Sequence, residues 1–263
     1  MQIDKTSCSQ LLDEFGIVPN KDKGQNYLIN PATAKRIAES LQIEESDKVL
    51  EIGPGLGSLT HFIDEKNNNL SIVEIDEKTC EVLRDIYPNI HVHNADALKF
   101  DMSRYNKIIS NVPYSITSDL LEYVLLNNDN LKQAIFMVQE DAYKRIVSLK
   151  GKDYGPLSIL MHLKGDIKPL FKVSPNDFYP RPKCVSIVFS VNVTNKYKLS
   201  KLQYHAIKTL FTNRRKTLLN NLTLLTNKEK AELLLDRLSL STNTRPEELS
   251  PETYVKLVSL YTN

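Results

Sequence analysis

The sequence predicts an α/β fold, in which a mostly parallel sheet is covered by helices on both faces, followed by a smaller domain made only of helices. Two observations predict it. Up to about residue 140, short apolar runs that suit buried strands alternate with segments of helical periodicity, and such alternation is typical of parallel sheets. From Leu199 onward the periodicity is helical. We therefore place a first domain at residues 1–191 and a helical domain at residues 192–263.

The elements of the first domain follow from local signals. A helix is expected to begin at Pro31 behind Asn30, because an Asn side chain caps free N–H groups and proline suits the first helical position. The strands expected after it are 48–52, 70–75, 90–93, 107–110 and 134–138. The helices expected around them are 59–63, 82–86, 117–127 and 140–149.

Beyond Gly165 the pattern changes. Residues 168–173 and 184–191 are typical of strands, and they flank a proline-rich loop, Phe178–Pro182. We expect the two strands to close the sheet as a hairpin-like pair. In the helical domain, the run Ser250-Pro251-Glu252 predicts the start of the last helix.

Composition sets broad limits. The chain has 263 residues, of which 41% are apolar and 25% charged, as is ordinary for a soluble globular protein. No apolar run reaches the roughly 18 residues of a membrane span, and the N-terminus lacks a signal-peptide pattern. Cys8, Cys80 and Cys184 are widely separated without C-x-x-C spacing, so they suggest neither a disulfide framework nor a zinc site. We expect a cytoplasmic protein with no membrane association and no bound metal.

Charge is unevenly distributed although the net charge is only +2. No Asp or Glu occurs from Phe178 to Asn227. The cations in that stretch include Arg181, Lys183, Lys208, Arg214, Arg215 and Lys216. A long basic segment is either a solvated face or a binding surface for a polyanion. The compact run Arg214-Arg215-Lys216, which we expect on a helix, favours contact with RNA phosphates that would position the RNA without reading its sequence.

A glycine-rich segment, Glu51–Gly57, lies between an expected strand and an expected helix. Gly53 and Gly55 would let the backbone approach a ligand at the carboxyl ends of the strands. The spacing is G-x-G-x-G, which differs from the dinucleotide pattern G-x-G-x-x-G and disfavours pyrophosphate binding. Glu74 ends the next strand about 20 residues on, where a carboxylate can accept both hydroxyls of a ribose. The pair fits S-adenosylmethionine or NAD, and a purely structural turn is the alternative.

Two further polar signals follow the next strands. Asp96, after the third strand, could meet the adenine amino group of a cofactor or simply cap a helix. After the fourth strand comes Asn111-Val112-Pro113-Tyr114. An adenine N6 amine is a poor nucleophile because its lone pair is delocalised, and two acceptors can aim that lone pair outward: the side-chain oxygen of Asn111 and a backbone carbonyl of Val112 or Pro113. Tyr114 would stack on the base. An ordinary turn is the alternative. Signals at four successive strand ends favour a methyltransferase.

These motifs resemble the small-subunit rRNA adenine dimethyltransferases of the KsgA type over nearly the whole chain. In the first domain the matching segments are GQNYL at 24–28, EIGPGLGSLT at 51–60, VEID at 73–76, NADAL at 94–98, NVPYSI at 111–116, YGPLSIL at 154–160 and FYPRPKCVS at 178–186. In the helical domain they are FTNRRKTLLNNL at 211–222 and RPEELSPETYVKL at 245–257. The last two segments are generally absent from the related large-subunit methylases of macrolide resistance.

The resemblance implies a Rossmann-like S-adenosylmethionine-dependent methyltransferase fold and a role for each motif. On the cofactor side, the implied contacts are Asn26 and Leu28 over the cofactor, Gly53 at its methionine end, Glu74 at its ribose, Asp96 at its adenine, and Asn111 where cofactor and target meet. On the target side, Tyr114 would stack on a flipped adenine and Phe178 would close the other side of the base. For Phe178 a place in the core is the alternative.

Three departures from the family pattern are small. Val112 stands where Leu is more frequent, and Tyr27 stands where Phe is usual. His162 stands where many members have Gln, and we expect it to be a hydrogen-bonded structural residue without a catalytic role.

The implied activity is N6-dimethylation of two adjacent adenosines in the 3′-terminal hairpin loop of 16S-type small-subunit rRNA, coupled to small-subunit biogenesis. The implied partner is that rRNA within an immature ribosomal subunit, and we expect the chain to act as a monomer. A loop base is easier to extrude than a paired one, which suits base flipping. Two alternatives stay open: a large-subunit (23S-type) rRNA adenine methylase, and a ribosome-assembly factor that acts mainly by binding.

Overall fold

The fold is described from a computed structural model, which gives residues 1–19, 25–67, 69–194 and 196–262. The chain divides into two compact units. The first contains Met1–Tyr143 and Ile167–Val193, and the second contains Lys144–Asp166 and Thr194–Asn263. The second unit thus includes a segment, residues 144–166, that lies within the first domain as drawn from the sequence. The functional division at residue 191 stays a prediction.

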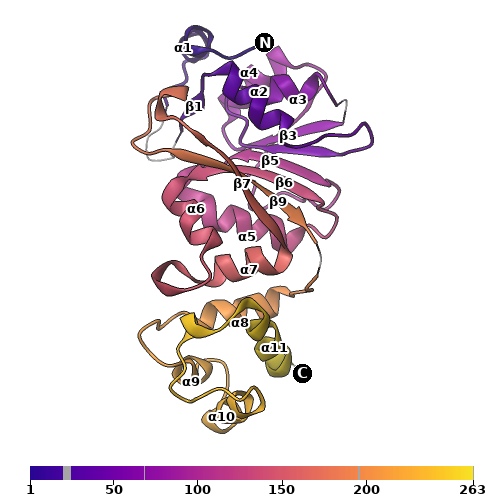
Figure 1. The fold of residues 1–263 in the computed structure, drawn as a ribbon. Helices are drawn as coiled ribbons and strands as arrows, with labels where there is room; N and C mark the ends of the chain where they lie inside the picture. The colour runs from indigo at the N-terminus through magenta and orange to yellow at the C-terminus, as the bar shows by residue number, and fades with distance from the viewer. Residues whose placement is uncertain (20–24, 68, 195, 263) are drawn as a thin grey trace. The chain divides into compact units, whose positions relative to one another are not determined.

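Within the described residues, the first unit is built on a seven-stranded sheet with the strand order β4-β3-β2-β5-β6-β9-β7 (Figure 1). The strands are β2 (Val49–Ile52), β3 (Leu70–Glu74), β4 (His91–Asn94), β5 (Lys107–Asn111), β6 (Gln133–Gln139), β7 (Gly165–Val173) and β9 (Ser186–Val193). The pairs from β4 to β6 are parallel, and β6 pairs with β9 in the antiparallel sense. The predicted α/β class and the closing pair β7 and β9 are confirmed, with strand ends that shift by up to three residues.

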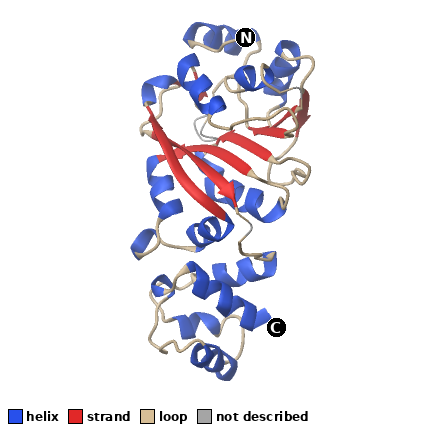
Figure 2. Cartoon of the chain, turned by 45° about the vertical axis from the view of Figure 1, so that its right-hand side comes forward, coloured by secondary structure: helices blue, strands red, loops and turns tan. Residues whose placement is uncertain are grey.

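Helices cover the sheet. The first unit contains α1 (Lys5–Glu14), α2 (Pro31–Glu39), α3 (Thr60–Asp64), α4 (Glu77–Ile86), α5 (Thr117–Asn127) and the start of α6 (Glu140–Val147). Helices α2, α3 and α4 pack on one face of the sheet and α5 lies on the other (Figure 1). Strand β2 is buried along its whole length, as expected for a parallel strand covered on both faces. The cartoon in Figure 2 shows the strands in red with the helices around them.

The start of α2 is fixed by the predicted cap. The Asn30 side-chain oxygen accepts hydrogen bonds from the N–H groups of Ala32 at 3.1 Å and Thr33 at 3.2 Å. The Asn30 amide also donates to Asp177 at 2.9 Å, and the Ile29 N–H donates to the Asp177 carbonyl at 2.8 Å. The capping residue therefore ties the start of α2 to the segment that precedes β8 (Phe178–Tyr179).

A short two-stranded ladder lies beside this cap and was not predicted. Strand β1 (Tyr27–Leu28) pairs with β8 in the antiparallel sense, with Leu28 opposite Phe178 and Tyr27 opposite Tyr179. Gly24, the first residue of the GQNYL motif, lies outside the described residues.

The second unit is helical. It contains α7 (Pro156–Lys164), α8 (Lys201–Leu210), α9 (Leu218–Leu222), α10 (Lys228–Arg237) and α11 (Pro251–Thr262), and the short 3-10 turns η2 (Gly151–Asp153) and η4 (Pro246–Glu248). The predicted start of α11 is confirmed. Three aromatic rings contact one another in the core of this unit: Phe211 meets Tyr154 edge-on and Tyr254 at a tilt. Among the described residues, the structure contains no helix with the length and apolar character of a membrane span.

The expectation of a helix at Arg214-Arg215-Lys216 is wrong. Helix α8 ends at Leu210, and the basic run lies in turns that precede α9. The physical reason is competition from polar side chains. The Asn221 amide accepts from the Asn213 N–H at 3.0 Å and donates to the Asn213 carbonyl at 3.2 Å, and the Thr217 side chain caps α9. Such bonds give the backbone an alternative to helical pairing.

Candidate active site

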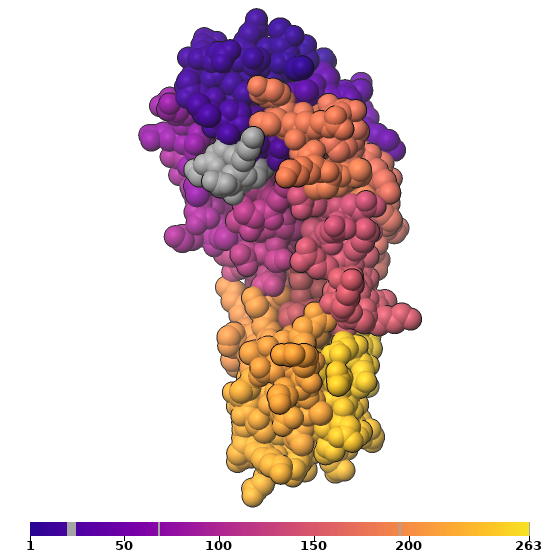
Figure 3. Space-filling view, turned by 90° about the vertical axis from the view of Figure 1, so that its left-hand side faces the viewer, coloured from indigo at the N-terminus to yellow at the C-terminus, as the bar shows by residue number. Residues whose placement is uncertain are grey.

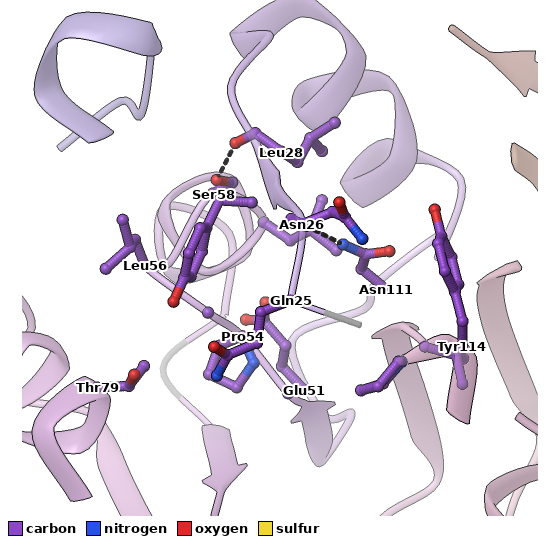
Figure 4. A pocket seen from close by; sticks show the side chains of 16 residues that line it. Gln25, Asn26, Leu28, Glu51, Pro54, Leu56, Ser58, Thr79, Asn111 and Tyr114 are labelled. Carbon is purple, nitrogen blue, oxygen red and sulfur yellow. Dashed lines mark hydrogen bonds between the residues drawn. The ribbon is translucent and has the colours of Figure 1, made fainter. Parts of the chain in front are cut away.

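A cavity opens where the parallel strands β2 and β5 end, beside β1 (Figure 4). It has about 680 Å³ of empty space, part of it open to solvent. Four segments line it: residues 25–28, the stretch from Glu51 to Leu59, Thr79 of α4, and residues 111–114. The structure therefore brings together Asn26, Leu28, Gly53, Gly55, Asn111, Pro113 and Tyr114 from the predicted site.

The glycine-rich turn forms the base of the cavity. Gly53, Gly55 and Gly57 have backbone φ angles of 64°, 57° and 86°. Residues other than glycine rarely adopt such positive φ angles. A Cβ atom on Gly57 would come within 2.8 Å of the Tyr87 ring, whereas a Cβ on Gly53 would meet no atom within 4 Å. Gly57 thus permits close packing below the turn, and Gly53 leaves open space above it for a ligand.

Glu51 is a cavity residue that sequence reasoning missed. Its side chain is 1% exposed, and one of its oxygens accepts a hydrogen bond from the Thr60 hydroxyl at 2.7 Å. Burial raises the pKa of Glu51 to about 8, although the hydrogen bond from Thr60 opposes the shift. A carboxyl in the middle of an apolar strand was the available signal, because such a residue is rarely buried without a partner.

Two predicted cofactor residues, Glu74 and Asp96, lie outside the lining of this cavity. They end or follow β3 and β4, and the register pairs Glu74 with Asn94. One Glu74 oxygen accepts from the N–H groups of Ile75 at 2.8 Å and Asp76 at 2.9 Å. Burial is the main cause that raises the pKa of Glu74, and these N–H groups oppose it. Asp96 accepts from the Leu98 N–H at 2.9 Å, and its predicted role stays a prediction.

The corner at Asn111–Tyr114 has a defined orientation. The Asn111 side-chain N–H donates to the Asn26 carbonyl at 3.4 Å, which leaves the Asn111 oxygen on the side of Tyr114 (Figure 4). The Pro113 carbonyl accepts from the Ile116 N–H at 3.2 Å and the Thr117 hydroxyl at 3.3 Å.

Tyr114 is half-buried, and its hydroxyl lies 3.4 Å from the Ser186 hydroxyl. Burial raises the pKa of Tyr114, so the phenol is neutral at neutral pH. An amide oxygen and a neutral aromatic ring can together hold a planar amine.

Phe178 is not among the residues that line the cavity. Its ring is 3% exposed and belongs to the core cluster of the sheet and α2. A ring this deeply buried can stack on a base only after a local rearrangement exposes it. Its predicted role stays a prediction.

The predicted RNA-binding residues are all exposed: Arg181, Lys183, Lys208, Arg214, Arg215 and Lys216. Arg214 differs from the others because its guanidinium donates to the carbonyls of Lys152 and Tyr154, each at 2.8 Å, and of Gly151 at 3.3 Å. His162 contacts the Val147 carbonyl at 3.2 Å within the second unit.

Comparison with known proteins gives a consistent result. The family model for ribosomal RNA adenine dimethylase matches residues 18–263. The chain is 38% identical over 247 residues to ribosomal RNA small subunit methyltransferase A of Malacoplasma penetrans, covering 90% of each chain. It is 36% identical over 254 residues to the protein of the same name from Francisella tularensis subsp. novicida, covering 91% of this chain and 96% of that one.

Two solved structures share the fold. A dimethyladenosine transferase from Plasmodium falciparum superposes with a TM-score of 0.74 at 24% identity, over 88% of this chain and 95% of that one. The 23S rRNA methyltransferase ErmE superposes with a TM-score of 0.63 at 24% identity, over 90% of this chain and 100% of that one. The family match over residues 18–263, with relatives above 35% identity along nearly their full length, shows that the chain belongs to the ribosomal RNA adenine dimethylase family.

Proposed function

We propose that the chain dimethylates the N6 amines of two adjacent adenosines in the 3′-terminal hairpin loop of small-subunit rRNA, with S-adenosylmethionine as methyl donor. Family membership and the relatives named small subunit methyltransferase A support the reaction and its substrate class. The observation that carries the mechanism is the Asn111 amide, whose N–H is held by the Asn26 carbonyl while its oxygen faces the Tyr114 side.

The cavity residues fit S-adenosylmethionine. Above Gly53 there is space that a Cβ atom would fill, and Asn26, Leu28 and Asn111 line the same cavity. Glu74 and Asp96 follow at neighbouring strand ends, where one carboxylate can accept ribose hydroxyls and the other an adenine amine. When bound, the cofactor supplies an electrophilic methyl group on a sulfonium.

The protein acts on the adenine amine mainly by positioning it. The Asn111 oxygen accepts one N–H of the amine, and a backbone carbonyl accepts the other, so the lone pair is directed at the methyl group. The Pro113 carbonyl already accepts two hydrogen bonds, which favours the Val112 carbonyl as the second acceptor. Tyr114 stacks on the base. The methylated ammonium is acidic and loses its proton to water, so no strong base is needed.

Exposed cations hold the RNA backbone. Arg181 and Lys183 lie in the first unit, and Lys208, Arg215 and Lys216 lie in the second. Arg214 also has a structural role, because its guanidinium donates hydrogen bonds to three backbone carbonyls. We further propose that the protein acts as a monomer in the cytoplasm on an immature small subunit, and that its binding is coupled to subunit maturation.

One assay tests the proposal. Methyl-labelled S-adenosylmethionine is supplied with unmethylated small and large ribosomal subunits in separate reactions, and dimethyladenosine is located by digestion and sequencing. We expect label only in the small subunit, at two adjacent adenosines of the terminal hairpin. Label only in the large subunit contradicts the substrate assignment, and binding to small subunits without label supports an assembly factor instead.

A further inference from the structure

Tyr27 has a polar atom for which the described part of the chain provides no hydrogen-bond partner. Its side chain is 6% exposed, and its hydroxyl is a buried oxygen without a hydrogen bond among the described residues. An unpaired buried hydroxyl is destabilising, so one in a native structure calls for a functional explanation. Tyr27 is also one of the residues that line the candidate active-site cavity.

The Tyr27 ring lies against the glycine-rich turn. A Cβ atom on Gly55 would come within 3.1 Å of the ring, and the ring packs in one cluster with Leu56 and Val82. The N–H of Gly55 also stabilises the Glu74 carboxylate. One glycine of the turn thus lies between the Tyr27 ring and the carboxylate that we assign to the ribose.

The electrostatic surroundings keep the Tyr27 phenol protonated. Burial raises its pKa, and the nearby Glu74 and Asp76 carboxylates raise it further. The hydroxyl is therefore a neutral donor that faces an acidic region without being hydrogen-bonded to it. A ligand oxygen that enters this region supplies an acceptor that the described residues do not provide.

We propose that the Tyr27 hydroxyl completes the ribose subsite of the cofactor cavity by donating a hydrogen bond to a ribose oxygen held by Glu74. This inference rests on the proposed cofactor and on the proposed role of Glu74. Because the hydroxyl is closed to water, the contact requires a local rearrangement when the ligand binds. A phenylalanine at this position would offer no such donor.

Cofactor binding by the Tyr27→Phe variant tests the inference. Dissociation constants for S-adenosylhomocysteine and for its 2′-deoxy and 3′-deoxy analogues are measured by calorimetry with both proteins. We expect the variant to bind S-adenosylhomocysteine about three- to ten-fold more weakly. The difference between the two proteins should vanish for the analogue that lacks the contacted hydroxyl. Equal affinities throughout, or one equal loss for all three ligands, would overturn the inference.

The melting temperature of Tyr27→Phe without ligand is a second measurement. If the Tyr27 hydroxyl stabilised the fold, its removal would lower this temperature. Tyr27→Phe removes an unpaired buried oxygen, so the melting temperature should rise. The matched control is Tyr87→Phe in the same unit, because the Tyr87 hydroxyl has acceptors in the carbonyls of Gly57 at 3.2 Å and Met1 at 3.3 Å. The control should melt at a lower temperature, and a similar fall in Tyr27→Phe would show that its hydroxyl has a partner in the protein.

The proposed cofactor and the proposed ribose contact can be disproved separately. If the unchanged protein binds neither S-adenosylmethionine nor S-adenosylhomocysteine, the proposed cofactor is wrong and the ribose contact falls with it. If the unchanged protein binds both and Tyr27→Phe binds them equally well, only the ribose contact is wrong.

Discussion

Two buried tyrosines in the core of the second unit differ from a buried tyrosine at the cavity of the first in how their hydroxyls are bonded. In the second unit, the hydroxyl of Tyr154 donates to the Leu249 carbonyl and that of Tyr254 to the Pro246 carbonyl, each at 2.7 Å. In the first unit, the Tyr27 hydroxyl has no hydrogen bond among the described residues. Satisfied polar groups stabilise and specify a core, whereas an unsatisfied one is a place where a ligand can complete the structure. The contrast separates a core in which Tyr154 and Tyr254 bind carbonyls of their own unit from a cavity wall that a ligand can complete.

The largest expected effect comes from replacing one asparagine in the cavity, with a buried asparagine of the second unit as its control. Asn111→Ala removes an acceptor from the first unit's cavity, and turnover of rRNA should fall by at least about 100-fold, by analogy with the loss of one catalytic hydrogen-bond partner. The melting temperature should change little, since the lost hydrogen bond to Asn26 is long at 3.4 Å.

Asn221→Ala in the second unit is the matched control. Asn221 is fully buried and bonds to Asn213 and Thr217, so this change should lower the melting temperature clearly. Near-normal turnover by Asn111→Ala would remove Asn111 from the mechanism.

The next effect concerns the satisfied tyrosines. Tyr254→Phe leaves the Pro246 carbonyl without its hydrogen bond in a core where Tyr254 is fully buried. The free energy of unfolding should fall by about 1–3 kcal/mol, measured by urea denaturation. If Tyr254→Phe and Tyr27→Phe change stability equally, the contrast between these two tyrosines is wrong.

A third effect is a dependence of stability on pH that belongs to the first unit. The pKa of Glu51 is raised from 4.5 to about 8 by burial, so the folded state favours the neutral carboxyl. The stabilisation from the neutral form is complete below pH 4.5 and is lost as pH rises through 8. Between these values the loss reaches at most about 1.4 kcal/mol per pH unit.

The variant Glu51→Gln stays neutral, so its unfolding free energy should decline less than that of the unchanged protein between pH 6 and pH 8. Urea denaturation at several pH values measures the difference. Parallel curves for the two proteins would mean that Glu51 is ionised in the fold.

The smallest effect separates two neighbouring arginines in the second unit. Arg215→Ala should lower the slope of log affinity for rRNA against log salt by about one, with the melting temperature unchanged. Arg214→Ala should also lower the melting temperature, because its guanidinium donates to three backbone carbonyls. Filter binding at several salt concentrations, together with thermal melts, separates the two. Equal salt slopes and equal melting temperatures of the two variants would mean that Arg214 has no structural role.

Local sequence signals predicted much of the first unit. Helix α5 has the predicted bounds 117–127, and Asn30 caps α2 as predicted, because both depend on contacts within a few residues. The central parallel strands β2, β3 and β5 were recognisable because burial on both faces makes them largely apolar. The strand ends then brought Gly53 and Asn111 into one cavity, since carboxyl ends of parallel strands meet at one edge.

What the sequence did not predict depends on partners far along the chain. The β1–β8 ladder joins residues about 150 positions apart, and two-residue strands have no periodicity. The turn at Arg214 depends on Asn221 and on carbonyls of residues 151–154. The raised pKa of Glu51 depends on its burial, which no local sequence pattern predicts. The space-filling view in Figure 3 shows the segment that contains β7 and β8 against N-terminal residues, a neighbourhood set by tertiary packing.

The β1–β8 ladder has one further consequence. Leu28, which lines the cavity, and Phe178, the predicted partner of the target base, face each other across it. Backbone hydrogen bonds make such a pair move as one piece, so a ligand that shifts Leu28 also shifts Phe178. Methyl donor and target adenine should therefore alter each other's affinity, and thermodynamic linkage requires the two changes to be equal in size. The ladder would couple binding of the cofactor to binding of the target base.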